Sequence, residues 1–549
     1  MRRIPVYLMM AVVALGMTLL LSTRASDRLG VTSVEGRLLV SPSQFADPSG
    51  TTDGEFMVAR PARFVATTLY EMTGRNLDTM RNIQRLLLVL FWMFWLVLLW
   101  RLLPPSMVLV AGALTLTQLL VLIIFNLAVP NLALSFLGGV SLAALGWDLL
   151  VESGNLGRGL RWVLWVLTLL AGVVDPYLWV AALALLAASK IKDSGGEMPW
   201  PKMVSWMLLS ILVPGLASLL LRSEWGLIEG LLFGSSQGDS LWGSVVKLAT
   251  AWMHQQSVQG EASSAVEIFA FLGIGYGQPT LLARGLSGVE SNWINPVTAL
   301  WGLFLILQAP VRLVVSILRK HTVDRWAPNL WVVTLLVLAF VHLWTFGNPE
   351  SAAGIAMVLF PILLLFGIKP LFGYISALDA RITAPLPWLR PLSLAVLLLV
   401  GSAALDTSHG LRILGQAEGA MKGDSQRRLA LAVETVIADA PETPIDYFGT
   451  GSLGCIDVHL SHSVNSRYVE FNEPLPLRTA LYQRGEQTPR IVVLEVPAEK
   501  AGAPLESLCQ TLFDEAKLEP ILEKKGWTLE SVLTIGSDGV PGFCLLTVK

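Results

Sequence analysis

The class of this protein is set by apolar stretches such as Arg85-Leu-Leu-Leu-Val-Leu-Phe-Trp-Met-Phe-Trp-Leu-Val-Leu-Leu-Trp-Arg101. As a helix, a run of this kind, taken as residues 85–103, is long enough to cross about 30 Å of hydrocarbon. Similar runs recur along the 549 residues, which are 53% hydrophobic and 15% charged, whereas a soluble protein carries about 25% charged residues. The sequence therefore predicts a polytopic α-helical membrane protein. The net charge of −2 and the lack of a basic tract give no indication of nucleic-acid binding.

We expect about eleven transmembrane helices. Residues 1–22 form the first helix or a signal anchor, with a cleaved signal peptide as the alternative, because Thr23-Arg24-Ala25 loosely fits a small-x-small cleavage site. Helices two to seven are expected within residues 85–222 and helices eight to eleven within residues 296–406. After the first, the expected runs are 85–103, 105–128, 131–151, 159–174, 176–190, 203–222, 296–318, 328–346, 351–369 and 389–406.

Lysine and arginine indicate which connections lie in the cytoplasm, because inside connections are enriched in them. The short outside connections 129–131, 175–177 and 347–350 carry neither residue when the N-terminus is cytoplasmic. With the same orientation, the inside connections contain Arg101, Arg158, Arg161, Lys190, Lys192, Lys202, Arg319, Lys320, Arg325, Lys369, Arg381 and Arg390. This segregation supports the expected number of spans.

Two large loops and the C-terminal region then lie outside. In the loop 23–84, the apolar spacing of Phe56–Gln84 predicts one or two helices along the membrane interface. The loop 223–295 contains amphipathic, Trp-rich stretches and the glycines of Gly273–Gly277, which favour a plain turn over a phosphate-binding loop because no strand precedes them. Residues 407–549 are expected to form a small extracytoplasmic α/β domain.

Within this tail, helices are predicted at Gln416–Ala440 and Pro504–Lys525, and strands at Ile445–Phe448, Cys455–Leu460, Arg490–Val496 and Phe543–Val548. The three cysteines, Cys455, Cys509 and Cys544, allow one disulfide or three unpaired thiols, and the spacing selects no pair. His459 and His462 do not predict a metal site, because two residues three apart on a strand point to opposite faces.

One charged stretch of the first loop, Asp53-Gly-Glu-Phe-Met-Val-Ala-Arg60-Pro-Ala-Arg63, contains an Asp-x-Glu followed by an aromatic residue and Ala59-Arg60. This pattern and the layout of spans, loops and tail resemble the GT-C superfamily of integral-membrane glycosyltransferases. That class includes protein O-mannosyltransferases and the lipid A aminoarabinose transferase. The alternative is structural, since Asp53-Gly54 also fits a turn before a helix whose N-terminus favours acids.

The resemblance implies transfer of a sugar from a polyprenyl-phosphate donor to a glycan, lipid or protein acceptor. The reaction would take place among membrane lipids, on the extracytoplasmic face of a bacterial inner membrane. Inversion at the anomeric carbon needs a base for the acceptor hydroxyl and cations for the leaving phosphate. A divalent cation could supply part of that charge, although the residues predict no metal site. The candidates are Asp53 or Glu55 as the base, and Arg60, Asp175, His254 and Arg284 as substrate-binding residues.

Two other functions fit part of the pattern. A lipid-linked glycan polymerase or ligase has a similar number of spans, but its main outside loop comes late, whereas the late outside connection here is only 347–350. A non-enzymatic scaffold or complex subunit is not disfavoured by the apolar spans. Transport is disfavoured, because the spans are nearly free of mid-membrane charge.

Overall fold

The computed structural model describes a large part of the helical region, the core of the C-terminal region and a few positions of the first loop. The described residues are 35, 39, 45–46, 60–116, 128–152, 154–175, 177–194, 204–205, 208, 296–346, 349–381, 401, 405, 418–438, 445–449, 456, 459–460, 466–470, 491–495, 505–515, 518–535 and 543–548.

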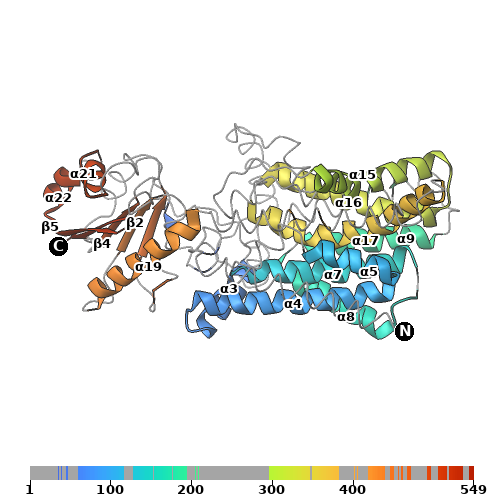
Figure 1. Cartoon of the computed structure of the whole chain (residues 1–549), viewed down its shortest axis with the longest axis horizontal. Coiled ribbons are helices and arrows are strands. Elements are labelled where there is room, and N and C mark those ends of the chain that lie inside the picture. Colours follow the sequence, from blue (N-terminus) through green and yellow to red (C-terminus); the bar gives the residue numbers. More distant parts are fainter. Residues whose placement is uncertain are drawn as a thin grey trace, which may run out of the picture.

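Nine helices of the described part run side by side along the long axis of the molecule (Figure 1). Four of them contain segments long and apolar enough to cross a membrane: Leu77–Leu102, Pro130–Leu150, Leu300–Leu318 and Gly354–Tyr374. The prediction of a helical bundle with membrane-crossing helices is thereby confirmed. The nine helices are α3 (Arg60–Met72), α4 (Leu77–Leu102), α5 (Pro105–Leu116), α7 (Pro130–Leu150), α8 (Arg158–Val174), α9 (Tyr177–Asp193), α15 (Pro296–Leu318), α16 (Val323–Phe346) and α17 (Pro349–Arg381).

The total of about eleven spans stays a prediction. Helices α4, α5, α7, α8, α9, α15, α16 and α17 coincide with eight of the expected runs, although α5 is described only as far as Leu116. The first expected helix lies outside the described residues. Only isolated positions of the runs 203–222 and 389–406 are described.

The turn between α3 and α4 fixes where the second expected span begins. Gly74, with φ of 65°, ends α3, and the amide of Arg75 donates to the carbonyl of Tyr70 at 3.0 Å, a common way to close a helix C-terminus. The Asn76 side chain then accepts from the Thr79 amide at 2.9 Å and caps α4. Helix α4 therefore starts at Leu77, eight residues before the apolar run that predicted it.

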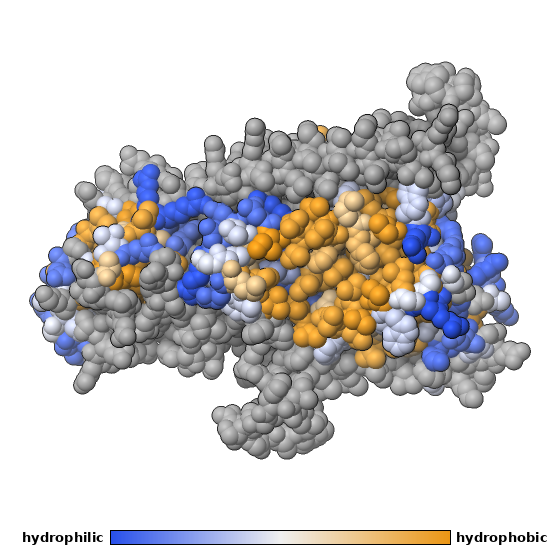
Figure 2. All heavy atoms as spheres, turned by 90° about the horizontal axis from the view of Figure 1, so that it is seen from below, coloured by the Kyte–Doolittle hydropathy of each residue, from blue (hydrophilic) through white to orange (hydrophobic). Residues whose placement is uncertain are grey.

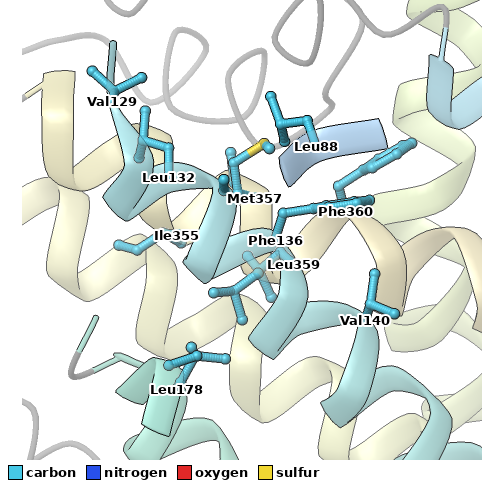
Figure 3. Close-up of a cluster of buried hydrophobic side chains, with 14 of the residues drawn as sticks. Leu88, Val129, Leu132, Phe136, Val140, Leu178, Ile355, Met357, Leu359 and Phe360 are labelled. Atoms are coloured by element: carbon cyan, nitrogen blue, oxygen red, sulfur yellow. The ribbon is translucent and has the colours of Figure 1, made fainter. Parts of the chain in front are cut away.

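Helix α7 occupies the centre of the bundle and packs against α4, α8, α9 and α17. A Cβ atom on Gly139 would lie 2.7 Å from the Val358 Cα of α17, so only glycine lets these two backbones approach so closely. Figure 3 shows the surrounding apolar core, in which Leu88, Phe136 and Leu178 come from three different helices. The glycines and small residues of α7 therefore decide how tightly the bundle closes.

Large apolar side chains also cover the outside of the bundle. Trp162 of α8 is 72% exposed and Leu170 of the same helix is 62% exposed. Figure 2 shows hydrophobic side chains gathered over the middle of the helical part, with hydrophilic side chains toward both of its ends. An apolar surface of this extent is stable against lipid and not against water.

The C-terminal region contributes five strands to a six-stranded sheet of order β1-β3-β2-β4-β6-β5. Strands β1, β3, β2 and β4 run parallel to one another, whereas β6 runs antiparallel to β4 and β5. The sheet lies beyond one end of the helical bundle, with helices α19, α21 and α22 (Figure 1). Its elements are β2 (Ile445–Gly449), β3 (Ser466–Glu470), β4 (Ile491–Glu495), β5 (Leu529–Ile535), β6 (Phe543–Val548), α19 (Glu418–Ile437), α21 (Leu505–Glu515) and α22 (Leu518–Lys525).

The sixth strand comes from the first loop. Phe45–Ala46 forms β1 and pairs with β3, with Phe45 opposite Tyr468 and Ala46 opposite Val469. A strand of two residues carries no periodic signal, and the sequence did not predict it. The first loop and the tail therefore share one sheet, although more than four hundred residues separate them.

The structure confirms some of the helices and strands that were predicted for the tail. Helix α19 and strands β2, β4 and β6 lie where expected, and the predicted helix Pro504–Lys525 is divided into α21 and α22. The predicted strand Cys455–Leu460 is wrong at the positions that the structure describes, because Ile456 and His459 lie in short 3₁₀ turns. Strands β3 and β5 were not predicted.

A disulfide joins Cys509 of α21 to Cys544 of β6. The sequence left this pairing open, because spacing alone does not encode connectivity. The bond fastens the helical layer to the sheet across a separation of 35 residues. Cys455 lies outside the described residues.

Candidate functional site

The connections predicted to lie outside come together at one end of the bundle, here called the outer end. Asp175, between α8 and α9, accepts a hydrogen bond from the Ser135 hydroxyl of α7 at 2.8 Å. Its other carboxylate oxygen accepts from the Tyr177 amide at 3.2 Å, as a capping residue of α9 does. A Cβ atom on Gly354 of α17 would lie 2.8 Å from the same carboxylate. The first two turns of α7 and α17, which follow two predicted outside connections, therefore meet Asp175 of the third.

The opposite end, here called the inner end, gathers cations that the charge pattern assigned to the cytoplasm. Arg161 of α8 pairs with the buried carboxylate of Asp148, and Lys192 of α9 donates to the carbonyl of Leu149 at 3.0 Å. Lys369 of α17 pairs with Glu152 and holds its pKa below the ordinary value, chiefly by a hydrogen bond from the ammonium group. The structure thus collects cations from three predicted inside connections.

A buried ion pair joins the first loop to the outer end. The Arg81 guanidinium of α4 donates to both carboxylate oxygens of Glu35, at 2.9 and 2.8 Å. The Ala128 amide donates to Glu35 as well, at 2.6 Å. Both charged side chains are almost completely buried, at 1% and 0% exposure. Gln84, one turn along α4, donates to the Val129 carbonyl at 3.1 Å and completes the contact with the start of α7.

Sequence reasoning missed Glu35 and Arg81. Arg81 lies before the apolar run 85–103 and was taken as part of an interfacial helix. Glu35 is a single acid in a loop, 46 residues from its partner. The one available signal was that α4 carries Arg81, Gln84 and Arg85 on the side opposite to an apolar face, which indicates contact with polar protein groups.

The structure locates two of the six predicted site residues and leaves four undescribed. Asp175 takes the position given above, and Arg60 is the first residue of α3. The capping hydrogen bond gives Asp175 a structural role, and its part in substrate binding stays a prediction. Asp53, Glu55, His254 and Arg284 lie outside the described residues, as do Gly273–Gly277 and His462.

A metal site was not predicted from the histidines. Among the residues that the structure describes, no group of three His, Cys, Asp or Glu side chains lies close enough together to hold an ion. His459, next to Leu460, lies near the outer end of α4.

No protein-family model and no curated protein sequence matches the chain. Among solved structures, the chain is similar to the crystal structure of ArnT from Cupriavidus metallidurans in the apo state, with a TM-score of 0.43, 13% identity and 97% of each chain covered. It is also similar to ArnT from Cupriavidus metallidurans bound to undecaprenyl phosphate, with a TM-score of 0.44, 12% identity and 97% of each chain covered.

Proposed function

We propose that this protein is a membrane glycosyltransferase that moves a sugar from a polyprenyl-phosphate carrier to an acceptor of the cell envelope. The reaction takes place at the outer end of the bundle, on the extracytoplasmic face of a bacterial inner membrane. Asp53 or Glu55 is the catalytic base.

The observation that carries the proposal is the anchoring of the first loop on both sides of these acids. Ala46 belongs to the tail sheet, and Arg60 begins a helix that packs on the bundle. At roughly 3.3–3.6 Å per residue, Asp53 stays within about 25 Å of Ala46, and Glu55 within about 18 Å of Arg60. This anchoring supports the proposal that both acids act near the outer end of the bundle, where the phosphate of a membrane-bound carrier would be.

The residues of this region can supply the chemistry. The carboxylate takes the proton of the acceptor hydroxyl while the hydroxyl oxygen forms a bond to the anomeric carbon. The bond from that carbon to the donor phosphate breaks, and polyprenyl phosphate leaves with inversion at the carbon. Arg60, His254 or Arg284 would stabilise the charge that develops on the leaving phosphate.

The disulfide of the tail supports the orientation. Cys509 and Cys544 are bonded, and disulfides persist on the oxidising side of a membrane and rarely in a cytosol. The tail sheet contains β1 of the first loop, so both regions lie on the same side. The charge pattern independently assigns these regions to the outside.

The function is tested in cells that lack the gene and carry Asp53→Asn or Glu55→Gln. Incorporation of labelled sugar from polyprenyl-phosphate donors into cell-envelope glycans is measured, and insertion of each variant is checked by membrane fractionation. We expect one variant to lose incorporation as fully as the deletion, because a base in contact with the acceptor contributes roughly 100- to 10,000-fold to the rate.

Glu71→Gln is the matched control, because Glu71 is an exposed acid on α3, where it pairs with Arg75. We expect normal incorporation from it. If the deletion itself changes no envelope glycan, the protein is not a glycosyltransferase and the scaffold interpretation replaces it. If the deletion changes a glycan while both acid variants retain incorporation, the transferase stands and the assignment of its base is wrong.

A further inference from the structure

A polar cavity lies where the tail meets the outer end of the bundle. Its volume is about 310 Å³, close to the lower limit of roughly 300 Å³ for small-molecule sites. One wall is the turn between α3 and α4, and the other is one face of α19 together with His459. The lining residues are Arg75, Asn76, Leu77, Asp78, Arg427, Ala430, Leu431, Glu434 and His459.

An ion pair joins the two walls of the cavity. Arg427 of α19 lies 3.6 Å from the carboxylate of Asp78 on α4. Their side chains are 43% and 63% exposed, so the cavity is open to solvent and a ligand can enter without any rearrangement of the bundle. The Arg75 side chain donates a hydrogen bond from Nε to the Glu71 carboxylate at 3.1 Å. The wall on the bundle side is therefore fixed before a ligand binds.

His459 contributes a largely buried imidazole to the wall of the cavity. Burial is the main cause that lowers its pKa to about 4, and the positive charges of Arg427 and Arg81 lower it further. The ring is neutral near neutral pH, where one nitrogen donates and the other accepts a hydrogen bond. Its Nε2 atom is buried away from the cavity surface and has no hydrogen-bond partner among the residues that the structure describes, so only the accessible part of the ring can meet a ligand.

The charges that line the cavity favour a neutral ligand. Arg75 and Arg427 balance Asp78 and Glu434, so an anion or a cation meets as much repulsion as attraction. A hydroxyl group both donates and accepts, and it can use the carboxylates, the guanidinium groups and the imidazole together. We infer that this cavity binds a neutral, polyhydroxylated ligand, namely one sugar unit of a glycan. The binding is independent of the transfer reaction.

The inference is tested by saturation-transfer NMR on the full chain in lipid nanodiscs. The neutral probes are the methyl glycosides of glucose, galactose, mannose and N-acetylglucosamine. Glucuronate and glucosamine serve as the anionic and cationic probes. We expect at least one neutral glycoside to bind and to compete with the others, and both charged probes to bind more weakly than it does.

Two variants assign the binding to the cavity. Arg427→Gln and Glu434→Gln should each weaken the affinity for the neutral probe by about tenfold or more, because each removes a charged hydrogen-bonding group. Arg428→Gln, the exposed neighbour of Arg427 that does not line the cavity, should leave binding unchanged. Thermal unfolding of all three shows whether they remain folded.

Three results would overturn the inference. One is that none of the four glycosides binds, and another is that glucuronate or glucosamine binds more tightly than all of them. The third is that Arg428→Gln weakens binding as much as Arg427→Gln does. Asp53→Asn should abolish transfer and leave this binding intact, so failure of the proposed function and failure of this inference give different results.

Discussion

Two ion pairs, one at each end of the helical bundle, differ in how deeply they are buried. At the outer end, Glu35 and Arg81 are almost fully buried, meet through two hydrogen bonds and join a loop to a helix. At the inner end, Lys369 of α17 and Glu152, which follows the end of α7, are 49% and 41% exposed. Exposed pairs contribute little to stability, whereas breaking a buried pair is costly.

This difference indicates that the two ion pairs have different structural roles. The exposed inner charges, such as Lys369 and Glu152, help to fix which side of the membrane each helix end occupies, and solvent satisfies whatever they leave unpaired. The outer charges keep a loop, a helix start and the tail in one arrangement beside a polar cavity. The catalytic site proposed for the first-loop acids would need such supporting contacts.

The largest effect is expected from Arg81→Met. The substitution leaves Glu35 buried without its cation, which costs roughly 3–5 kcal/mol and should release the first loop. Thermal unfolding and limited proteolysis of the purified protein measure it. Arg101→Met is the control, because Arg101 is an exposed arginine at the inner end of the same helix. Equal loss of stability in both variants would abolish the distinction between the two ends.

A slightly smaller effect is expected from Cys509→Ser. The disulfide closes a separation of 35 residues, and the loop-entropy model assigns about 4 kcal/mol or somewhat less to such a bond. Unfolding of the tail should shift to lower temperature in this variant and in wild type treated with reductant. Cys455→Ser is the control and should unfold as wild type does. If the thiols of Cys509 and Cys544 are free in protein taken from cells, the tail is not on an oxidising side.

The pH dependence tests His459. Because its pKa falls from 6.5 to about 4 on folding, the unfolded chain binds the proton more readily between these values. Stability is therefore complete above about pH 6.5 and is lost as the pH falls toward 4, by on the order of 2–3 kcal/mol. His459→Gln should flatten this part of the profile, measured by thermal unfolding across the window. An unchanged slope would show that His459 is not buried against the bundle.

The smallest effect is expected at the inner end. Lys369→Met removes an exposed pair and should cost less than about 1 kcal/mol, because solvent replaces the lost partner. Thermal unfolding beside wild type measures it, and Lys369→Arg, which keeps the charge, is the control. A loss as large as that of Arg81→Met would contradict the assignment of different roles to the two ends.

Much of the bundle could be predicted from sequence, because transmembrane helices are encoded locally. The apolar runs gave eight of the described helices, and the charge pattern anticipated which connections meet at Asp175 and which meet at Lys369. These signals need no knowledge of distant residues. They follow from the cost of leaving a charge or a backbone amide in hydrocarbon.

The contacts that build the outer end could not be predicted in this way. Glu35 forms an ion pair with Arg81, 46 residues further along the chain. Phe45 pairs with Tyr468, which follows all of the membrane helices in the sequence. Such pairs leave no periodic pattern, and the choice of Cys544 as partner of Cys509 is equally absent from the spacing. The charged stretch Asp53–Arg63 could be identified from the sequence, and its role in catalysis stays a prediction.

Transfer by the purified protein tests the central claim most directly. Wild type, Asp53→Asn, Glu55→Gln and Glu71→Gln are compared in nanodiscs, with a labelled polyprenyl-phosphate sugar and an envelope extract as acceptor. The account predicts that wild type and Glu71→Gln release polyprenyl phosphate and that Asp53→Asn or Glu55→Gln is slower by about 100-fold or more. Wild-type rates in both variants of the first-loop acids would contradict it.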